Sequence, residues 1–411
     1  MTVDPERCTM LFALAGQADA DNISPAIWSV ARDGSPVLVY VADAAVRREL
    51  ATAWWLRECP NVKLVSVAPW GPHGGVRERI GRLRWNRWRL KRALEQSNVR
   101  LVIMEWKEGI AHHHASWLRS LVRWWSADVF MQLQFVAADM GIPTVSLPHG
   151  HSTKTSIIRS EHIRSEMAKH SGKLAFADRD SHAAYVFASE YHRKVIVNNS
   201  TMSGTNTYVW GSARFNDVWV QRLYDATPTT ELPPMVGGQI RRVLLFVPKW
   251  HNLVDRVETM KLIGALGNQP ELQLVVRGHL RARDTSFSES ESALLRRSNV
   301  VMVPEGISSP SLIRGCDVVV DVDSSIAFDA VLLNKPYVRP RYLQDASVRT
   351  IWDELGGAHQ TDSCEATVAL LTQTTLQPAP RDATFDDVVF GGSGEIVLDR
   401  YRDELRALAN R

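Results

Sequence analysis

Residues Cys316–Pro340 read CDVVVDVDSSIAFDAVLLNKPYVRP. The apolar, β-branched run Val318–Val322 ends at Asp323, and a helical pattern over Ile326–Leu333 follows before an Asn-Lys-Pro sequence starts another extended run. A short strand, a helix and a second short strand in this order are typical of a sheet whose parallel strands are joined by helices.

Short apolar runs and longer helical patterns alternate in the same way along the rest of the chain, with helices expected over Ala44–Trp55 and Phe130–Met140. This alternation predicts an α/β fold with doubly wound parallel sheets. The further strands that we expect are Thr9–Leu14, Pro36–Val41, Val62–Val67, Val99–Met104, Thr144–Leu147, Ala184–Phe187, Val195–Val197, Val243–Pro248, Leu272–Val276, Val300–Val303 and Pro336–Val338.

The stretch Asp225–Gly238 reads DATPTTELPPMVGG, and its Pro, Thr and Gly residues indicate a linker between two domains. We expect a first domain over residues 1–225, a linker over 226–238, a second domain over 239–385 and a C-terminal helix over 386–411 that packs back on the first domain. Two such domains facing each other place a ligand-binding cleft at the carboxyl ends of their strands.

The composition, 45% hydrophobic and 23% charged residues, is that of an ordinary soluble globular protein. The net charge is only +3, which argues against nucleic acid as the partner. The four cysteines contain no CxxC pair, which suits a reducing cytoplasm and predicts no zinc site. No apolar run is long enough for a transmembrane helix and the N-terminus is a poor signal peptide, so we expect a cytoplasmic protein.

One segment is strongly basic: Arg77–Arg92 reads RERIGRLRWNRWRLKR, and ten of the 14 tryptophans lie before residue 150. Basic residues with tryptophan on a helix fit an anionic membrane surface. A solvated helix whose Arg stems cover apolar surface explains the pattern equally well, and nucleic acid explains it less well. The triple histidine His112–His114 has no carboxylate or Cys at ligand spacing, so we favour a surface position over a metal site.

Polar residues follow the expected strand Thr144–Leu147 in the sequence SLPHGHSTK. Pro148 ends the strand, so His149 lies at its carboxyl end, where an imidazole can act as a general base near neutral pH. His151 competes for this role, and Lys154 adds positive charge for an anionic substrate.

Three later segments carry cations or hydroxyls at strand ends, as expected for a phosphate site. Lys249 follows one strand, Arg277 and His279 follow the next, and Ser324 with Ser325 opens the helix after Val318–Val322. Helix N-termini attract anions. The alternatives are a surface lysine, a merely basic loop and simple helix capping.

In this order, these segments resemble the bacterial CDP-glycerol glycerophosphotransferases and the related capsule glycosyltransferases of the GT-B fold. The shared elements are a His-Gly-x-x-x-Lys turn, a Pro-x-Trp motif, an Arg-x-His motif, an Asp-x-Ser-Ser-x-x-Phe-Asp motif leading to Lys-Pro, and a Gly-Ser-x-Arg-Phe segment. They lie at His149–Lys154, Pro248–Trp250, Arg277–His279, Asp323–Pro336 and Gly211–Asn216.

The resemblance implies a GT-B-like fold and the transfer of a sugar or polyol phosphate in cell-surface polysaccharide biosynthesis. The donor would be a CDP-, CMP- or UDP-linked group, the acceptor a glycan or lipid-linked glycan, and no cofactor or metal would be required. By motif, the implied catalytic residues are His149 and His279, the donor-binding residues are Lys249, Arg277, Asp323, Ser324, Ser325 and Lys335, and the acceptor- or phosphate-binding residues are His151, Lys154 and Arg214.

Some features depart from the pattern or leave other functions open. His251 stands where the family has an arginine, and Leu280 stands where it has a proline. Asp321-Val322-Asp323 is formally a DxD sequence, but its place before two serines favours a strand end over a Mg²⁺ site. GT-B proteins also include nucleotide-sugar 2-epimerases, which would need carboxylates in the cleft, and a non-catalytic glycan-binding protein is a third alternative.

Overall fold

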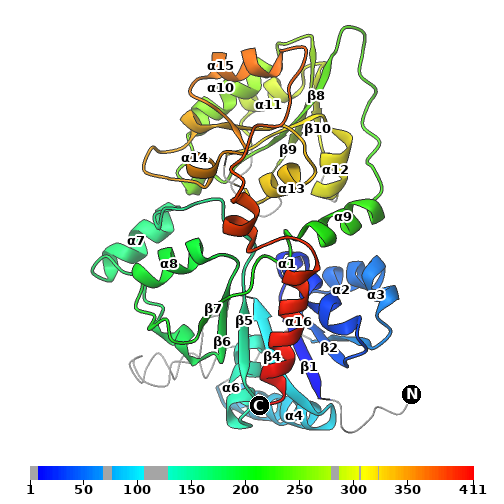
Figure 1. Ribbon diagram of the computed structural model, residues 1–411, viewed down its shortest axis with the longest axis vertical. Helices are drawn as coiled ribbons and strands as arrows, with labels where there is room; N and C mark the ends of the chain where they lie inside the picture. Colours follow the sequence, from blue (N-terminus) through cyan, green and yellow to red (C-terminus); the bar gives the residue numbers. More distant parts are fainter. Residues whose placement is uncertain (1–7, 68–75, 106–127, 279–286, 305–306, 323) are drawn as a thin grey trace. The chain divides into compact units, whose positions relative to one another are not determined.

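The computed structural model describes residues 8–67, 76–105, 128–278, 287–304, 307–322 and 324–411, with the backbone alone over 76–85. The chain forms two compact units (Figure 1). Unit 1 comprises Met1–Gly150, Lys173–Asn216 and Phe390–Arg411, and unit 2 comprises His151–Gly172 and Asp217–Val389.

Unit 1 is built on a seven-stranded sheet with the order β3-β2-β1-β4-β5-β6-β7, in which every neighbouring pair is parallel. Its strands are β1 (Thr9–Leu14), β2 (Val37–Val41), β3 (Val62–Ser66), β4 (Val99–Glu105), β5 (Thr144–Leu147), β6 (Ala184–Phe187) and β7 (Thr207–Val209). Its helices are α1 (Gln17–Ala31), α2 (Ala44–Ala51), α3 (Trp54–Glu58), α4 (Val76–Gln96), α6 (Val129–Asp139), α8 (Glu190–Asn198) and α16 (Glu395–Ala409), with a 3-10 turn at Ala177–Ser181.

Unit 2 contains a second parallel sheet, of six strands, with the order β10-β9-β8-β11-β12-β13. Its strands are β8 (Arg241–Phe246), β9 (Leu272–Arg277), β10 (Val300–Met302), β11 (Val318–Val320), β12 (Tyr337–Pro340) and β13 (His359–Thr361). Its helices are α7 (Glu161–Lys169), α9 (Asp217–Ala226), α10 (Arg256–Leu266), α11 (Glu289–Leu295), α12 (Ser309–Gly315), α13 (Ile326–Leu332), α14 (Trp352–Leu355) and α15 (Cys364–Leu371), with short 3-10 turns at Trp250–Asn252 and Arg341–Leu343. A π-helical turn at Asp386–Phe390 spans the boundary back to unit 1 in the sequence.

These two sheets confirm the predicted α/β class, because apolar runs buried on both faces form their central strands. All six residues of β1 are buried, and so are all six of β9. The strand expected over Val195–Val197 is wrong, since these residues lie inside α8. Ser189 caps that helix through its side chain and Ile196 is buried, so the helical surroundings override the β-branched pattern.

The strands β7 and β13, which are three residues long each, were not predicted from the sequence. The helix expected over Ala44–Trp55 is divided into α2 and α3. Residues 151–172 belong to unit 2, whereas we expected them in the first domain. Among the helices that the structure describes, none has the length and apolar character needed to cross a bilayer.

The C-terminal segment is part of unit 1, where α16 packs against α1 (Figure 1). Arg32 at the end of α1 forms ion pairs with Glu395 and Asp399, at 2.7 and 2.8 Å. The Tyr401 hydroxyl donates to the Gly211 carbonyl at 2.8 Å. The ion pairs tie α16 to α1, and the Tyr401 hydrogen bond ties it to the loop after β7.

Gly211 is held where a larger residue does not fit, with a φ of +92° and with the Phe390 carbonyl oxygen 2.9 Å from the position of an added Cβ. We expect Gly211→Ala to reduce the free energy of unfolding by about 2–3 kcal/mol, because backbone strain adds to the clash. Gly141 has a φ of +69° with nothing within 4 Å, so Gly141→Ala is the matched control. Equal losses of melting temperature in the two variants would contradict the close packing described here.

Candidate active site

The carboxyl edge of the unit 1 sheet brings together two residues that are far apart in the sequence. Glu105 is the last residue of β4 and lies in register with Leu147, the last residue of β5. His149 follows two residues later, in a turn that Gly150 completes with a φ of +65°. Because β4 and β5 are parallel neighbours, both side chains lie at the edge where α/β sheets bind ligands.

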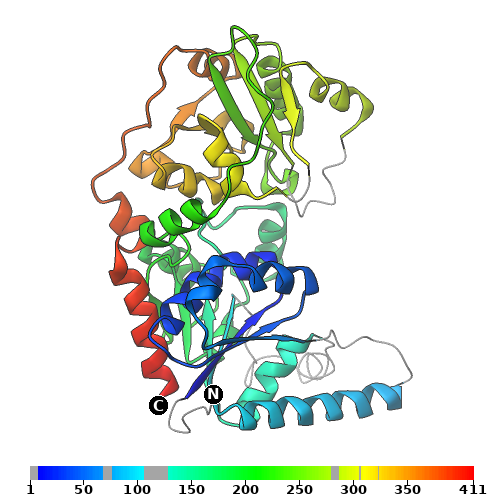
Figure 2. The ribbon, with the colours of Figure 1, turned by 90° about the vertical axis from the view of Figure 1, so that its right-hand side faces the viewer.

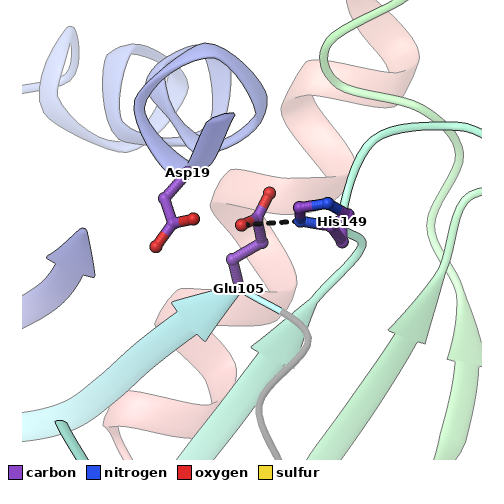
Figure 3. A group of neighbouring side chains, drawn as sticks. All are labelled: Asp19, Glu105 and His149. Carbon is purple, nitrogen blue, oxygen red and sulfur yellow. Dashed lines mark ion pairs between the residues drawn. The ribbon is translucent and has the colours of Figure 1, made fainter. Parts of the chain in front are cut away.

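Glu105 and His149 form a hydrogen-bonded pair, with 2.8 Å between Glu105 Oε2 and His149 Nδ1 (Figure 3). The Glu105 side chain is 3% exposed, whereas the His149 side chain is 48% exposed. Asn22 of α1 donates from Nδ2 to the other carboxylate oxygen, Glu105 Oε1, at 2.7 Å. The buried carboxylate therefore holds a half-exposed imidazole in a fixed orientation.

The charge of Glu105 decides which nitrogen of His149 carries the proton. Burial raises the pKa of the Glu105 carboxyl, but its hydrogen bonds with His149, Asp19 and Asn22 and the charge of His149 outweigh burial and lower that pKa below its ordinary value. An ionised carboxylate only accepts hydrogen bonds, so His149 Nδ1 is the donor. In neutral His149, Nε2 then carries a lone pair that can take a proton from a substrate.

Asp19 is the third acid–base group of this cluster and comes from the first turn of α1 (Figure 3). Its Oδ2 accepts from the Ala15 backbone N–H at 2.6 Å. Asp19, Glu105 and His149 each present one ligand atom, and these atoms lie within 4.8 Å of one another. Two carboxylates and an imidazole could hold a divalent cation, whereas the sequence predicted no metal.

We expect that removing divalent cations leaves this site intact, because the Glu105 oxygens are already occupied by hydrogen bonds from His149 and Asn22. Dialysis against EDTA should then change neither turnover nor melting temperature, and added Mn²⁺ should not raise the melting temperature. A rise with Mn²⁺ that is lost in Asp19→Asn would instead show a metal site.

The structure places Arg214 in unit 1, where its side chain is buried and is held by Asp21 of α1. Its Nε donates to Asp21 Oδ1 at 2.8 Å, and its guanidinium lies 4.8 Å from the centre of the Phe215 ring. These contacts give Arg214 a structural role in unit 1. Whether it also meets an acceptor, as expected from its motif, stays a prediction.

Unit 2 gathers the predicted donor-binding cations and hydroxyls at the carboxyl edge of its own sheet. Lys249 follows β8, Arg277 ends β9, and Ser324 and Ser325 follow β11, which are three adjacent parallel strands. Arg277 is buried and donates to the Pro304 carbonyl at 2.6 Å. The strands β8 and β11 are parallel neighbours, but the chain continues from β8 to β9 and β10 on one side of them and from β11 to β12 and β13 on the other. Sheets of this kind bind ligands at the point where the strand order reverses.

Lys335 does not lie at this edge. It comes before β12 and therefore lies at the amino ends of the parallel strands. Its Nζ donates to the carbonyl oxygens of Arg314 and Cys316, and burial lowers its pKa. The structure thus places Lys335 apart from the other expected donor-binding residues, with its ammonium group on the backbone at the end of α12, and its role in donor binding stays a prediction.

His151 and Lys154 belong to unit 2, and both side chains are buried there. The imidazole of His151 packs against the Phe328 ring of α13, with 4.8 Å between the ring centres. Lys154 pairs through its backbone with Thr350. Their packing explains their burial, and the expected contact with an acceptor or phosphate stays a prediction.

Several predicted residues lie outside the described part of the chain: His279, Asp323 and the triple histidine His112–His114. Of Arg77–Arg92, the structure gives the helix α4, with side chains from residue 86 onward. The roles expected of these residues stay predictions.

Sequence reasoning missed Glu105, Asp19 and Asn22. The only signal for Glu105 was that it ends an apolar run, one residue beyond the expected strand. No signal marked Asp19 or Asn22, because polar residues in the first turns of a helix are common.

Comparisons with known proteins show likeness at the level of the fold. No family model matches the chain, and no curated protein sequence matches it. A solved UDP-N-acetylglucosamine 2-epimerase superposes with a TM-score of 0.58 at 12% identity, covering 98% of this chain and 97% of its own.

Two further structures extend the same finding. The UDP-GlcNAc 2-epimerase from Methanocaldococcus jannaschii has a TM-score of 0.55 at 10% identity, covering 98% of this chain and 100% of its own. The UDP-GlcNAc 2-epimerase from Neisseria meningitidis, solved bound to UDP-GlcNAc, has a TM-score of 0.53 at 12% identity, covering 98% of this chain and 94% of its own. Across nearly its whole length, this chain therefore has a GT-B-like fold.

Proposed function

We propose that this chain is a transferase that moves a sugar or polyol phosphate from a nucleotide-activated donor to a hydroxyl of a glycan acceptor. The Glu105–His149 hydrogen bond of 2.8 Å carries the proposal, because it leaves Nε2 of a half-exposed imidazole ready to accept a proton. The acceptor oxygen bonds to the donor's reacting carbon or phosphorus, the bond to the nucleotide breaks, and the hydroxyl proton moves to His149 Nε2.

The residues at the carboxyl edge of unit 2 support the donor half of this proposal. Lys249 and Arg277 supply positive charge, and Ser324 and Ser325 supply hydroxyl donors, at the ends of adjacent strands. Such groups stabilise the negative charge that develops on a departing nucleotide. A CDP-, CMP- or UDP-linked donor fits this chemistry, and the motif resemblance favours a cell-surface polysaccharide as acceptor.

The test combines binding with turnover on the full chain. Melting temperatures in the presence of CMP, CDP, UDP and GDP identify the nucleotide, since a ligand of the folded state raises the melting temperature. Donors of the selected nucleotide are then incubated with and without glycan acceptors. Nucleotide release that depends on the acceptor supports transfer; no binding and no release with any donor contradicts it.

A nucleotide-sugar 2-epimerase is the second candidate, and one observation favours it. Asp19 and Glu105 place two carboxylates beside His149, and carboxylates in the site are what an epimerase would need. The fold likeness to UDP-GlcNAc 2-epimerases is compatible with this activity but does not show it. We place transfer first because Glu105 is engaged by His149 and Asn22, which leaves His149 as the exposed base.

Solvent isotope exchange separates the two candidates. An epimerase incorporates deuterium at C2 of the sugar when it turns over in D₂O without acceptor, because that carbon loses and regains a proton. A transferase leaves C2 unlabelled and releases nucleotide only when an acceptor hydroxyl is present.

A further inference from the structure

Helix α4 (Val76–Gln96) presents a compact basic and aromatic surface that the proposed function does not use. Trp88 is 49% exposed, and Arg89, Lys91 and Arg92 are exposed beside it. The Arg92 guanidinium lies 5.5 Å from the centre of the Trp88 ring, which places charge and ring together. We call Trp88, Arg89, Lys91 and Arg92 the α4 surface.

The opposite side of α4 is buried in the interior of unit 1. Leu90 and Leu94 are buried in the core of unit 1, where α4 packs against α6. Arg87 turns the same way, donating to Gln132 at 2.6 Å with its guanidinium 5.1 Å from the centre of the Phe135 ring. Because the apolar side of the helix is buried against α6 and the core of unit 1, the α4 surface faces solvent. Figure 2 shows α4 in light blue along the margin of unit 1.

Charge is concentrated on this helix and nearly balanced elsewhere. Eight of the sixteen residues over Arg77–Arg92 are Lys or Arg and one is acidic, although the whole chain carries only +3. A local cluster of this kind attracts anionic lipid headgroups at short range. An exposed indole beside the cations matches the lipid–water interface, where tryptophan is enriched.

We propose that the α4 surface docks the protein on an anionic lipid bilayer. The cations bind the headgroup phosphates while Trp88 enters the interface as an anchor. The inference goes beyond the proposed transfer reaction and stands without it, since vesicle binding requires neither donor nor acceptor. Docking of this kind would bring the enzyme to acceptors carried on lipid.

The experiment is sedimentation of the full chain with phosphatidylcholine vesicles, with and without phosphatidylglycerol, at low and high salt. We expect binding only to the anionic vesicles and a decrease with salt. Arg89→Glu/Lys91→Glu/Arg92→Glu should reduce the partition coefficient by at least about tenfold. Trp88→Ala should reduce mainly the binding that persists at high salt.

The matched control is Arg47→Glu/Arg48→Glu/Lys63→Glu, which reverses three exposed cations elsewhere in unit 1 and changes the net charge equally. It should bind vesicles like the unaltered protein. If the α4 triple variant fails to fold by circular dichroism, the glutamine versions of the same three residues replace it.

Three results would overturn the proposal: no binding to anionic vesicles, an equal loss in the control, or binding to a single-stranded oligonucleotide without binding to vesicles. The last result would assign the α4 surface to nucleic acid, because aromatic and basic side chains together also bind single strands.

Discussion

His149→Ala is expected to reduce acceptor-dependent turnover by about 10²- to 10⁴-fold, because the variant lacks the group that takes the proton from the attacking hydroxyl. The melting temperature should change little, since the His149 side chain is 48% exposed and contributes little to the core. Initial rates at saturating donor, with nucleotide affinity measured separately, test this expectation. Nucleotide binding should persist, because the proposed donor residues lie in unit 2.

The control is His162→Ala, which removes another exposed imidazole, on α7. Its turnover and melting temperature should both match those of the unaltered protein. Full activity of a folded His149→Ala protein would remove His149 from the mechanism. It would leave the carboxylates of Asp19 and Glu105 as the remaining acid–base groups of the described site.

The sequence allowed the position of His149 to be predicted because the information is local. An apolar run at Thr144–Leu147 is followed by a proline and a glycine, and β5 has the same bounds as the expected strand. The turn therefore follows from neighbouring residues alone. The same holds for β1 and β6, whose bounds also agree with the prediction.

The partners of His149 could not be predicted, because they depend on which strands become neighbours. Glu105 reaches His149 only because β4 pairs with β5, and Asn22 reaches Glu105 only because α1 follows the adjacent strand β1. No local pattern encodes this pairing. His151 shows the same dependence on tertiary contacts: it lies two residues from His149 in the sequence but belongs to unit 2, where it packs against Phe328.

Glu105→Gln is expected to reduce turnover by about 10²- to 10⁴-fold while the fold survives. The reason is that an amide in place of the carboxylate moves the proton of neutral His149 from Nδ1 to Nε2. Asn22 Nδ2 donates toward one end of the side chain at position 105, so the glutamine carbonyl oxygen faces Asn22. Its NH₂ group then faces His149 Nδ1 and makes that nitrogen an acceptor. The proton moves to Nε2, which can no longer act as a base.

A second substitution distinguishes this tautomer effect from a simple loss of charge or packing. In Glu105→Gln/Asn22→Asp, the new carboxylate accepts from the glutamine NH₂ group, which turns the glutamine oxygen back toward His149 Nδ1. The Nδ1–H tautomer returns, and at least about tenfold of the lost turnover should return with it. Asn22→Asp alone should lose activity, because it places a carboxylate against Glu105 Oε1, which now receives a hydrogen bond at 2.7 Å. A double variant no more active than Glu105→Gln would show that Glu105 acts through its charge, and that Asn22 does not set the orientation of the pair.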